Sequence, residues 1–361
     1  MPQTLKIGII GCGGIAGGKH LPALATLPDV EIAAFCDIVP DRAAQARAKY
    51  GSADAKVYDT YQELLADDSL DIVHVLTPNN SHAEITVAAL EAGKHVNCEK
   101  PMAKTAQEAR LMLEAARRTG RKLTISYQNR FRDDSQYLHH AIGQGDLGEI
   151  YYAKAHAVRR RAVPTWGVFL DAEKQGGGPL IDIGTHALDL ALWLMDNYEP
   201  KTVLGQTFRK LGDRENAANA FGSWDPKQFT TEDAAVGMIT LQDGATITLE
   251  ASWALNIMDT EEATCTLCGT EGGADFHDGL RLNGERYSRL YNNQVVLGGG
   301  GVAFFDAAPT PNAAAEAEMR SWVNAVRTNT DVVVKPEQAL VVSEILEAIY
   351  TSAKTGKAID F

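Results

Sequence analysis

The feature that most constrains the fold is a glycine-rich turn that follows an apolar segment near the N-terminus. Residues 5–10 are apolar apart from Lys6, and Gly11, Gly13 and Ala16 complete a Gly-x-Gly-x-x-Ala pattern. This order predicts a buried strand, a tight turn and a helix. Gly11 permits the turn, Gly13 lets the backbone approach a pyrophosphate, and Ala16 lets the helix pack closely on the strand. The first N–H groups of that helix would face the phosphates.

A second apolar segment ends in an acidic residue at the spacing expected for a dinucleotide-binding fold. Val30–Cys36 predicts a strand, and Asp37 lies about 20 residues beyond the turn. A carboxylate there accepts hydrogen bonds from the adenosine ribose and repels a 2′-phosphate, so NAD is preferred over NADP. Arg42 either stacks on the adenine or is an ordinary charge on a helix surface. The cofactor-binding residues expected in this part of the chain are Gly11, Gly13, Gly14, Ile15, Ala16, Asp37 and Arg42.

Length and charge limit the class of protein. A chain of 361 residues predicts two domains, and a net charge of −13 without a basic block argues against binding nucleic acid or an anionic membrane. No apolar stretch is long enough to span a bilayer, and we expect no signal peptide, so the predicted location is cytoplasmic. The five cysteines are expected to be reduced thiols rather than a disulfide framework. Cys265 and Cys268 would point to opposite faces of a strand, so no metal site is expected.

The first 127 residues alternate between strand-like and helix-like segments. The predicted strands are Leu5–Ile10, Val30–Cys36, Ile72–Leu76, His95–Cys98 and Leu123–Ser126, with helices between them. Alternation of this kind, with continuously apolar strands, predicts a doubly wound parallel sheet covered on both faces. We therefore expect a Rossmann domain at residues 1–127.

The pattern changes in residues 128–361. Strand-like segments with alternating apolar and polar positions occur at Tyr151–Val158, Lys201–Phe208, Ala234–Leu241, Thr246–Trp253 and Ala263–Leu267, and helices are predicted at Ala313–Thr328 and Pro336–Thr355. These segments predict an α+β domain for substrate binding and oligomerisation, with a large, open-faced, mainly antiparallel sheet. Its C-terminal helices are able to pack back on the first domain. An exposed sheet face needs a partner, so a homodimer or homotetramer is expected. The run Gly298–Gly301 lacks the lysine and helix of a phosphate loop and predicts a surface loop.

Three polar loops follow strands of the first domain at the edge where open α/β sheets bind ligands. They are Thr77–His82, Glu99–Pro101 and Tyr127–Phe131. Lys100, between a strand end and a proline, is predicted to be held in the crevice lined by these loops. The cofactor contacts expected from the loops are Thr77, Pro78, Asn79, His82, Glu99, Lys100 and Gln128, and the candidate substrate contacts are Asn129 and Arg130.

A second glycine-rich turn, Gly176–Gly178, precedes a very apolar helix in the second domain. Asp182 and His186 lie four residues apart near its start, so they share a helix face. Alone, this pair would fit a helix cap and a buried histidine. Beside a dinucleotide fold with a candidate lysine, the pair favours a proton-handling site.

Together these segments resemble the Gfo/Idh/MocA oxidoreductases, a family that includes glucose–fructose oxidoreductase and inositol dehydrogenase. The resemblance rests on the Glu99–Pro101 turn and on residues 176–186, and it extends over nearly the whole chain. It implies a Rossmann domain, an open-faced sheet that often forms dimers or tetramers, and oxidation of ring hydroxyls of sugars and inositols with NAD or NADP. The family's Lys, Asp and His correspond to Lys100, Asp182 and His186.

The chemistry of these side chains agrees with alcohol oxidation. Loss of hydride from a secondary alcohol requires loss of the hydroxyl proton, and an imidazole, with an ordinary pKa of about 6.5, is a suitable base. Lys100 would bind the same oxygen and stabilise its alkoxide character. Asp182 would bind substrate hydroxyls or orient the imidazole. His186 is favoured over Lys100 as the first proton acceptor, and the sequence leaves both open.

Further substrate contacts are predicted just before the second glycine-rich turn. Arg160 and Trp166 lie in a basic, aromatic segment that either covers the site or forms a solvated edge, and His156 lies on the preceding strand. An aromatic ring suits the C–H face of a sugar. In relatives, the segment from Arg160 to Phe169 is associated with sugar and inositol dehydrogenases, including levoglucosan-type and glycoside 3-dehydrogenases.

Two other functions compete with an NAD-dependent polyol dehydrogenase. One is an NAD-assisted enzyme that cleaves glycosides by oxidation and elimination, which would need a further base. The other is a sugar or nucleotide sensor without catalysis, which would not need the proton-handling residues Lys100, Asp182 and His186.

Overall fold

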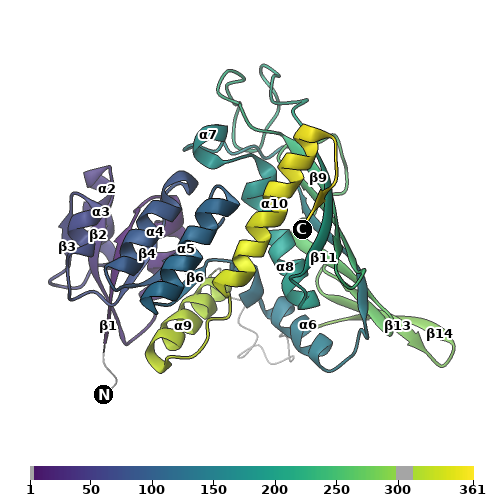
Figure 1. Ribbon diagram of the computed structural model, residues 1–361, viewed down its shortest axis with the longest axis horizontal. Coiled ribbons are helices and arrows are strands. Elements are labelled where there is room, and N and C mark those ends of the chain that lie inside the picture. Colours follow the sequence, from purple (N-terminus) through teal and green to yellow (C-terminus); the bar gives the residue numbers. More distant parts are fainter. Residues whose placement is uncertain (1–3, 298–311) are drawn as a thin grey trace. The chain divides into compact units, whose positions relative to one another are not determined.

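The computed structural model describes residues 4–297 and 312–361, which divide into two compact units (Figure 1). The first unit holds the chain through Phe131, α9 (Ala313–Thr328) and α10 (Pro336–Thr355) as far as Leu340. The second unit holds the chain from Arg132 onwards and the rest of α10. The division is therefore discontinuous in sequence, whereas the sequence predicted one boundary between residues 127 and 128, with C-terminal helices able to pack back on the first domain. The glycine run at residues 298–301 lies outside the described residues.

The first unit contains a six-stranded parallel sheet in the order β3-β2-β1-β4-β5-β6. Its strands are β1 (Leu5–Ile10), β2 (Val30–Cys36), β3 (Lys56–Tyr58), β4 (Ile72–Val75), β5 (His95–Cys98) and β6 (Leu123–Ile125). The predicted doubly wound sheet is confirmed, and its order reverses between β1 and β4, where such sheets bind ligands. The prediction missed β3, a short edge strand without a buried residue.

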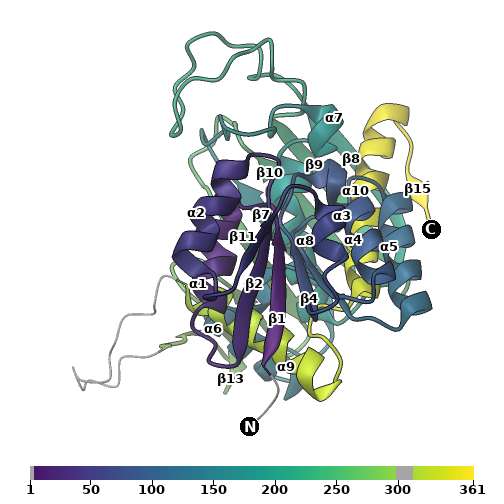
Figure 2. The same ribbon diagram turned by 90° about the vertical axis from the view of Figure 1, so that its left-hand side faces the viewer.

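Helices cover both faces of this sheet, with α1 and α2 on one side and α4 and α5 on the other (Figure 2). The helical segments are η1 (Ala16–His20), α1 (Leu21–Leu24), α2 (Pro40–Tyr50), α3 (Tyr61–Leu65), η2 (Asn79–Ser81), α4 (His82–Glu91), α5 (Ala106–Thr119) and η3 (Gln128–Phe131). Met319 and Trp322 of α9 belong to the same hydrophobic cluster as Ile7 and Ile9 of β1. A helix from the C-terminal part of the chain therefore completes the core of the first unit.

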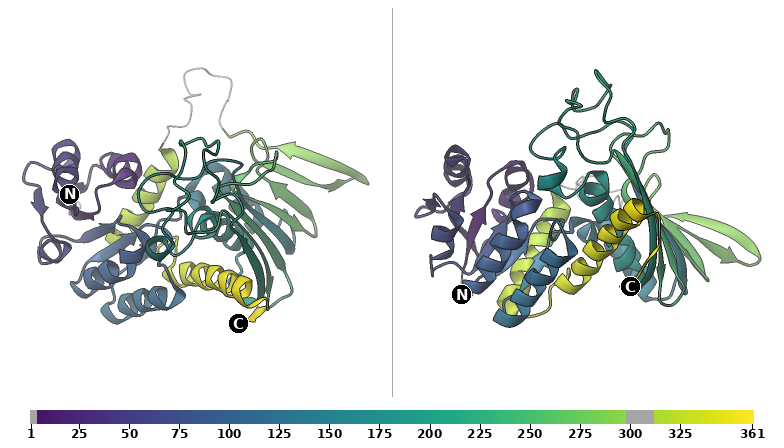
Figure 3. Two further views of the ribbon diagram at one scale, coloured as in Figure 1. Left: turned by 90° about the horizontal axis from the view of Figure 1, so that it is seen from above. Right: turned by 45° about the horizontal axis from the view of Figure 1, so that its top comes forward.

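The second unit contains a nine-stranded sheet in the order β14-β13-β12-β11-β7-β10-β9-β8-β15. Its strands are β7 (Ile150–Val158), β8 (Pro200–Phe208), β9 (Ala234–Leu241), β10 (Thr246–Ser252), β11 (Glu262–Gly269), β12 (Gly272–Asp275), β13 (Arg281–Arg286), β14 (Arg289–Gln294) and β15 (Ile359–Asp360). β7 and β10 pair in parallel and the other described pairs are antiparallel, which confirms the predicted sheet type. The β13–β14 hairpin, which was not predicted, projects from the sheet (Figure 3).

Helices cover one face of this sheet, and apolar side chains are exposed on the other. The helical segments of the second unit are α6 (Asp133–Gly143), α7 (Ala172–Gln175), η4 (Leu180–Gly184) and α8 (Thr185–Met195), besides the later part of α10. η4 and α8 pack against β7, β10 and β11, and Ala153 and Ala155 of β7 are buried under them. On the opposite face, Leu204 and Met238 are each 50% exposed. No helix in the described ranges is long and apolar enough to cross a bilayer.

Candidate active site

The first glycine-rich turn has the geometry of a phosphate cradle. Gly11 has a φ of +93°, and a Cβ there would lie 2.6 Å from the carbonyl oxygen of Leu76, so only glycine fits. A Cβ on Gly13 or Gly14 would meet no atom within 4 Å, which leaves open space above the turn. The helix begins at Ala16 as a π-helical segment, a form often found at functional sites. These features fit the pyrophosphate of a dinucleotide.

Asp37 is tied to the same turn. Its Oδ2 accepts a hydrogen bond of 2.7 Å from the N–H of Cys12, and its Oδ1 accepts one of 2.8 Å from the N–H of Val39. Each carboxylate oxygen has a further lone pair available to a ribose hydroxyl. Asp37 therefore has a structural role in the turn as well as the predicted contact with the cofactor. Arg42 is exposed on α2.

The loops after β4 and β5 are joined by His82. Its buried imidazole places Nδ1 2.8 Å from the carbonyl oxygen of Pro101 and Nε2 2.8 Å from that of Thr77. Burial lowers the pKa of His82. A neutral imidazole carries one N–H, so the predicted cofactor residue His82 lies between the two loops and donates to one of these carbonyl oxygens, and Lys100 lies within the second loop.

The three residues predicted as contacts in the loop after β6 differ in burial. Arg130 is fully buried, and its Nη1 donates to the carbonyl oxygen of Val333 at 3.2 Å and to Oε1 of Gln338 at 2.7 Å. These contacts tie η3 to the C-terminal segment of the first unit and favour a structural role for Arg130. Asn129 is also buried, whereas Gln128 is partly exposed.

In the second unit, Asp182 and His186 lie on the adjoining segments η4 and α8. Gly176 has a φ of +86° and the π-helical segment η4 follows, so the predicted turn and helix are confirmed. Asp182 is buried, and its Oδ2 accepts a 3.0 Å hydrogen bond from Nε1 of Trp253. Between Leu180 and Leu194, every residue is buried except His186. The partly exposed side chain in this stretch is thus an imidazole, which is suited to proton transfer near neutral pH.

A buried carboxylate that the sequence analysis missed holds this helix start in place. Glu232 accepts hydrogen bonds from the N–H of Gly178 at 2.9 Å, from the N–H of Leu180 at 3.2 Å and from the hydroxyl of Tyr350 at 2.8 Å. A Cβ on Gly177 would lie 2.0 Å from that hydroxyl oxygen, which explains the glycine. Burial raises the pKa of Glu232. The only sequence signal was the glycine run itself.

An aromatic path leads from the surface to Asp182. Trp166 is 53% exposed and makes edge contacts with Phe221 and Phe169, with ring centroids 4.9 and 5.9 Å apart. Phe169 in turn contacts Trp253, with centroids 6.3 Å apart, and Trp253 donates to Asp182. The predicted substrate residue Trp166 is therefore linked to the acidic side chain. Arg160 is exposed in the same segment.

His156 does not join this group of residues. In β7 the side chains alternate, and Ala155 and Ala157 are buried beneath the helices, so His156 lies on the opposite face. There its Nε2 lies 3.5 Å from Oγ1 of Thr266 and 3.9 Å from Glu261. The expectation that His156 points toward the substrate is corrected by this strand register.

The fold and site define a dinucleotide-binding oxidoreductase with a separate α/β domain. Residues 5–127 match the family description "oxidoreductase family, NAD-binding Rossmann fold", and residues 139–361 match "oxidoreductase family, C-terminal alpha/beta domain". The chain belongs to this family, the Gfo/Idh/MocA oxidoreductases.

Comparisons with individual proteins agree. The chain is 36% identical to the D-glucoside 3-dehydrogenase of Escherichia coli K12 over 361 residues, 99% of this chain and 98% of that protein. It is 35% identical to the inositol 2-dehydrogenase of Salmonella typhimurium over 203 residues, 56% of this chain and 57% of that protein. The crystal structure of levoglucosan dehydrogenase with NADH and levoglucosan shares the fold, with a TM-score of 0.86, 24% identity and 99% of both chains covered.

Two alanine substitutions separate the two roles of the first turn. Gly11→Ala should lower the free energy of unfolding by about 1–3 kcal/mol, because it strains a left-handed backbone and meets Leu76. Gly13→Ala, which meets no atom within 4 Å, should leave the melting temperature unchanged and weaken NAD binding. Calorimetry of both variants with and without NAD tests this, and equal effects on folding would contradict it.

Proposed function

We propose that this protein is an NAD-dependent dehydrogenase that transfers a hydride from a ring secondary alcohol of a sugar, glycoside or inositol and so forms the ketone. Among these, a glycoside is the best-supported substrate. The observation that carries the proposal is the similarity over the full chain to D-glucoside 3-dehydrogenase. The exposed Trp166, connected through Phe169 to the ring that holds Asp182, supports a sugar face as ligand.

The roles of the side chains follow from their environments. His186, the one residue between Leu180 and Leu194 that is not fully buried, takes the hydroxyl proton. Asp182, fixed by the indole of Trp253, binds a substrate hydroxyl or orients the imidazole. Lys100 binds the reacting oxygen and stabilises its alkoxide character. When bound at the first glycine-rich turn, the nicotinamide supplies the hydride acceptor.

Asn129 and Arg160 are kept as proposed substrate contacts, while Arg130 and His156 are not. The cofactor is proposed to contact the turn and loops through Gly11, Gly13, Gly14, Ile15, Ala16, Asp37, Arg42, Thr77, Pro78, Asn79, Glu99, Lys100 and Gln128. We also propose a cytoplasmic location, which the five free cysteines support.

The proposed reaction predicts NADH formation with glycosides, hexoses or inositols and NAD. His186→Ala should lower kcat by about a hundredfold or more, because the alcohol loses its general base, while NAD affinity stays the same. His140→Ala, at an exposed position on α6, is the matched control and should be neutral. Absorbance of NADH and titration with NAD measure both.

The same assay distinguishes the competing functions. Glycoside cleavage without net NADH would indicate oxidation followed by elimination. Sugar binding without either product would indicate a sensor. Unchanged turnover in His186→Ala would remove His186 from the mechanism, and a double variant with Lys100→Met would then show which side chain handles the proton.

The cofactor preference is proposed to depend on the charge of Asp37. Asp37→Asn keeps an acceptor for the turn but removes the charge that repels a 2′-phosphate. The ratio of kcat/KM for NAD to that for NADP should fall by about tenfold, or about 1.4 kcal/mol. An unchanged ratio with normal stability would show that Asp37 does not determine the preference.

We propose a homodimer or homotetramer assembled through the open face of the second unit's sheet. Leu204 and Met238 are paired across β8 and β9, and Val236 beside them is 41% exposed, so an apolar patch lies on this face. Met238→Glu should reduce the molar mass measured by light scattering, and Gln206→Glu on the same face should have a smaller effect. An unchanged mass in Met238→Glu would place the interface elsewhere.

A further inference from the structure

A cluster of charged and polar side chains is buried in the first unit behind the turn that carries Lys100. Its members come from segments far apart in the sequence. They are Lys19 and His20 of η1, His74 of β4, Glu99 after β5 and Glu318 of α9. All of them are buried. The proposed reaction assigns no role to Lys19, His20, His74 or Glu318, so their burial needs another explanation.

Lys19 is shared between two carboxylates. Its Nζ lies 2.9 Å from Oε1 of Glu99 and 3.1 Å from Oε2 of Glu318, and all three side chains are less than 10% exposed, at 8%, 6% and 3%. Burial lowers the pKa of Lys19, but Glu318 and Glu99 outweigh it and raise the pKa overall. Burial likewise raises the pKa of Glu99, but Lys19 and His20 outweigh it and hold that pKa well below its usual range. Both groups therefore stay charged.

The two histidines are neutral members of the cluster with defined tautomers. Nε2 of His20 lies 2.9 Å from Oε1 of Glu99, and a carboxylate only accepts, so this nitrogen carries the proton. Nδ1 of His20 then accepts from Nδ1 of His74, 3.0 Å away. Burial lowers the pKa of both imidazoles, which keeps each of them singly protonated.

The other oxygen of Glu99 reaches the backbone of Lys100. Oε2 accepts a 3.0 Å hydrogen bond from the N–H of Lys100. One carboxylate thus joins Lys19, on the helix that follows the first glycine-rich turn, to the residue proposed to bind the reacting oxygen. If Glu99 turned away, the N–H of Lys100 would lose this acceptor, and if Glu99 lost its charge, the hydrogen bond would be weaker.

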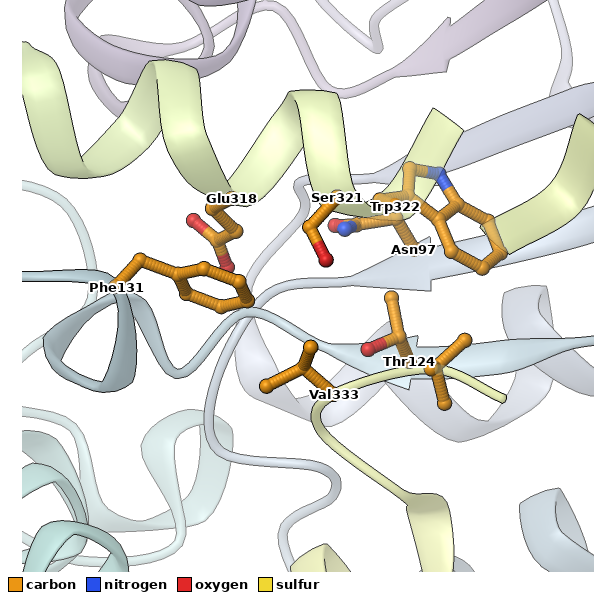
Figure 4. A pocket seen from close by; sticks show the side chains of 8 residues that line it. Asn97, Thr124, Phe131, Glu318, Ser321, Trp322 and Val333 are labelled. Atoms are coloured by element: carbon orange, nitrogen blue, oxygen red, sulfur yellow. The ribbon is translucent and has the colours of Figure 1, made fainter. Parts of the chain in front are cut away.

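Glu318 joins the cluster from α9, which belongs to the C-terminal part of the chain. Figure 4 shows Glu318, Ser321 and Trp322 of α9 around a small cavity, opposite Asn97 of β5 and Thr124 of β6. Phe131, Val332 and Val333 complete its lining. Because Glu318 belongs to α9 and pairs with Lys19, the position of Lys19 depends on the packing of α9 as well as on Glu99.

We propose that Lys19 is a positioning residue for Lys100, acting through Glu99 and held in turn by Glu318. Lys19 keeps the Glu99 carboxylate in place, and that carboxylate fixes the backbone of Lys100. The predicted effect on turnover rests on the proposed function. The predicted effect on the backbone of Lys100 does not, because it can be measured in a protein without activity.

The test compares Lys19→Met with Lys19→Arg, and uses Lys6→Met as a matched control. The side chain of Lys6 forms a surface pair, with Nζ 3.9 Å from Oε2 of Glu31, and is 41% exposed. In Lys19→Met, the Lys100 amide should exchange with deuterium at least about tenfold faster, because Glu99 no longer holds it. Lys19→Arg should restore protection, and Lys6→Met should match the natural protein.

Turnover supplies the second measurement. In Lys19→Met, kcat should fall by about 10–100-fold because Lys100 is displaced, and NAD affinity should fall by less, because Glu99 and Lys100 are proposed cofactor contacts but the glycine-rich turn is intact. Loss of the ammonium should also raise the pKa of Glu99, so the acid limb of the kcat profile should move to higher pH. The titratable groups facing Glu99 in this shift are Lys19, His20, His74, His82, Cys98, Lys100 and Glu318.

The possible outcomes are distinct. Normal Lys100 protection in a folded Lys19→Met protein would overturn the proposal, whatever its activity. Faster exchange together with a natural protein that oxidises no alcohol would support the positioning role and reject the proposed function. If Lys19→Met does not fold, Lys19→Gln keeps one donor without the charge, and the same exchange and pH measurements on it decide the question.

Discussion

The contact between Gly11 and the carbonyl of Leu76 is the constraint on which the first unit depends. It is possible only because β1 and β4 are neighbours in the sheet and because residue 11 has no side chain. This adjacency is the point where the strand order reverses, so the turn after β1 and the loop after β4 open at the same edge. Asp37 then closes the turn from β2 through the N–H of Cys12. The cradle is thus held from two neighbouring strands.

In both units, a buried carboxylate accepts hydrogen bonds from the backbone of a segment that bears a proposed catalytic side chain. Glu99 holds the Lys100 backbone, and Glu232 holds the N–H groups of Gly178 and Leu180 at the start of the helix with His186. Asp182 is held by an indole N–H. A buried carboxylate needs several donors, which fixes it and everything bonded to it. The side chains proposed for the reaction, Lys100, Asp182 and His186, therefore lie on segments held by buried hydrogen bonds.

Much of the fold could be predicted from the sequence, because it depends on local patterns. The strands β1, β2, β5 and β9 and the helix α9 begin and end where the sequence predicted them. The prediction failed where the pattern is weak, as in the polar hairpin β13–β14, and where a face must be assigned, as for His156. Strand alternation separates two faces, but only the packing of α8 decides which of them is covered.

The sequence by itself determined the parallel sheet, the glycine cradle with its acidic partner and the family to which the chain belongs, since each rests on short apolar segments and motifs that are recognised within a local stretch of chain. The tertiary structure decided what surrounds them. Only folding brings Lys19 against Glu318, Glu232 against Tyr350 and Trp253 against Asp182. The two residues of each pair are far apart in the sequence. They meet only when whole helices and strands pack together, and no local sequence pattern predicts that packing.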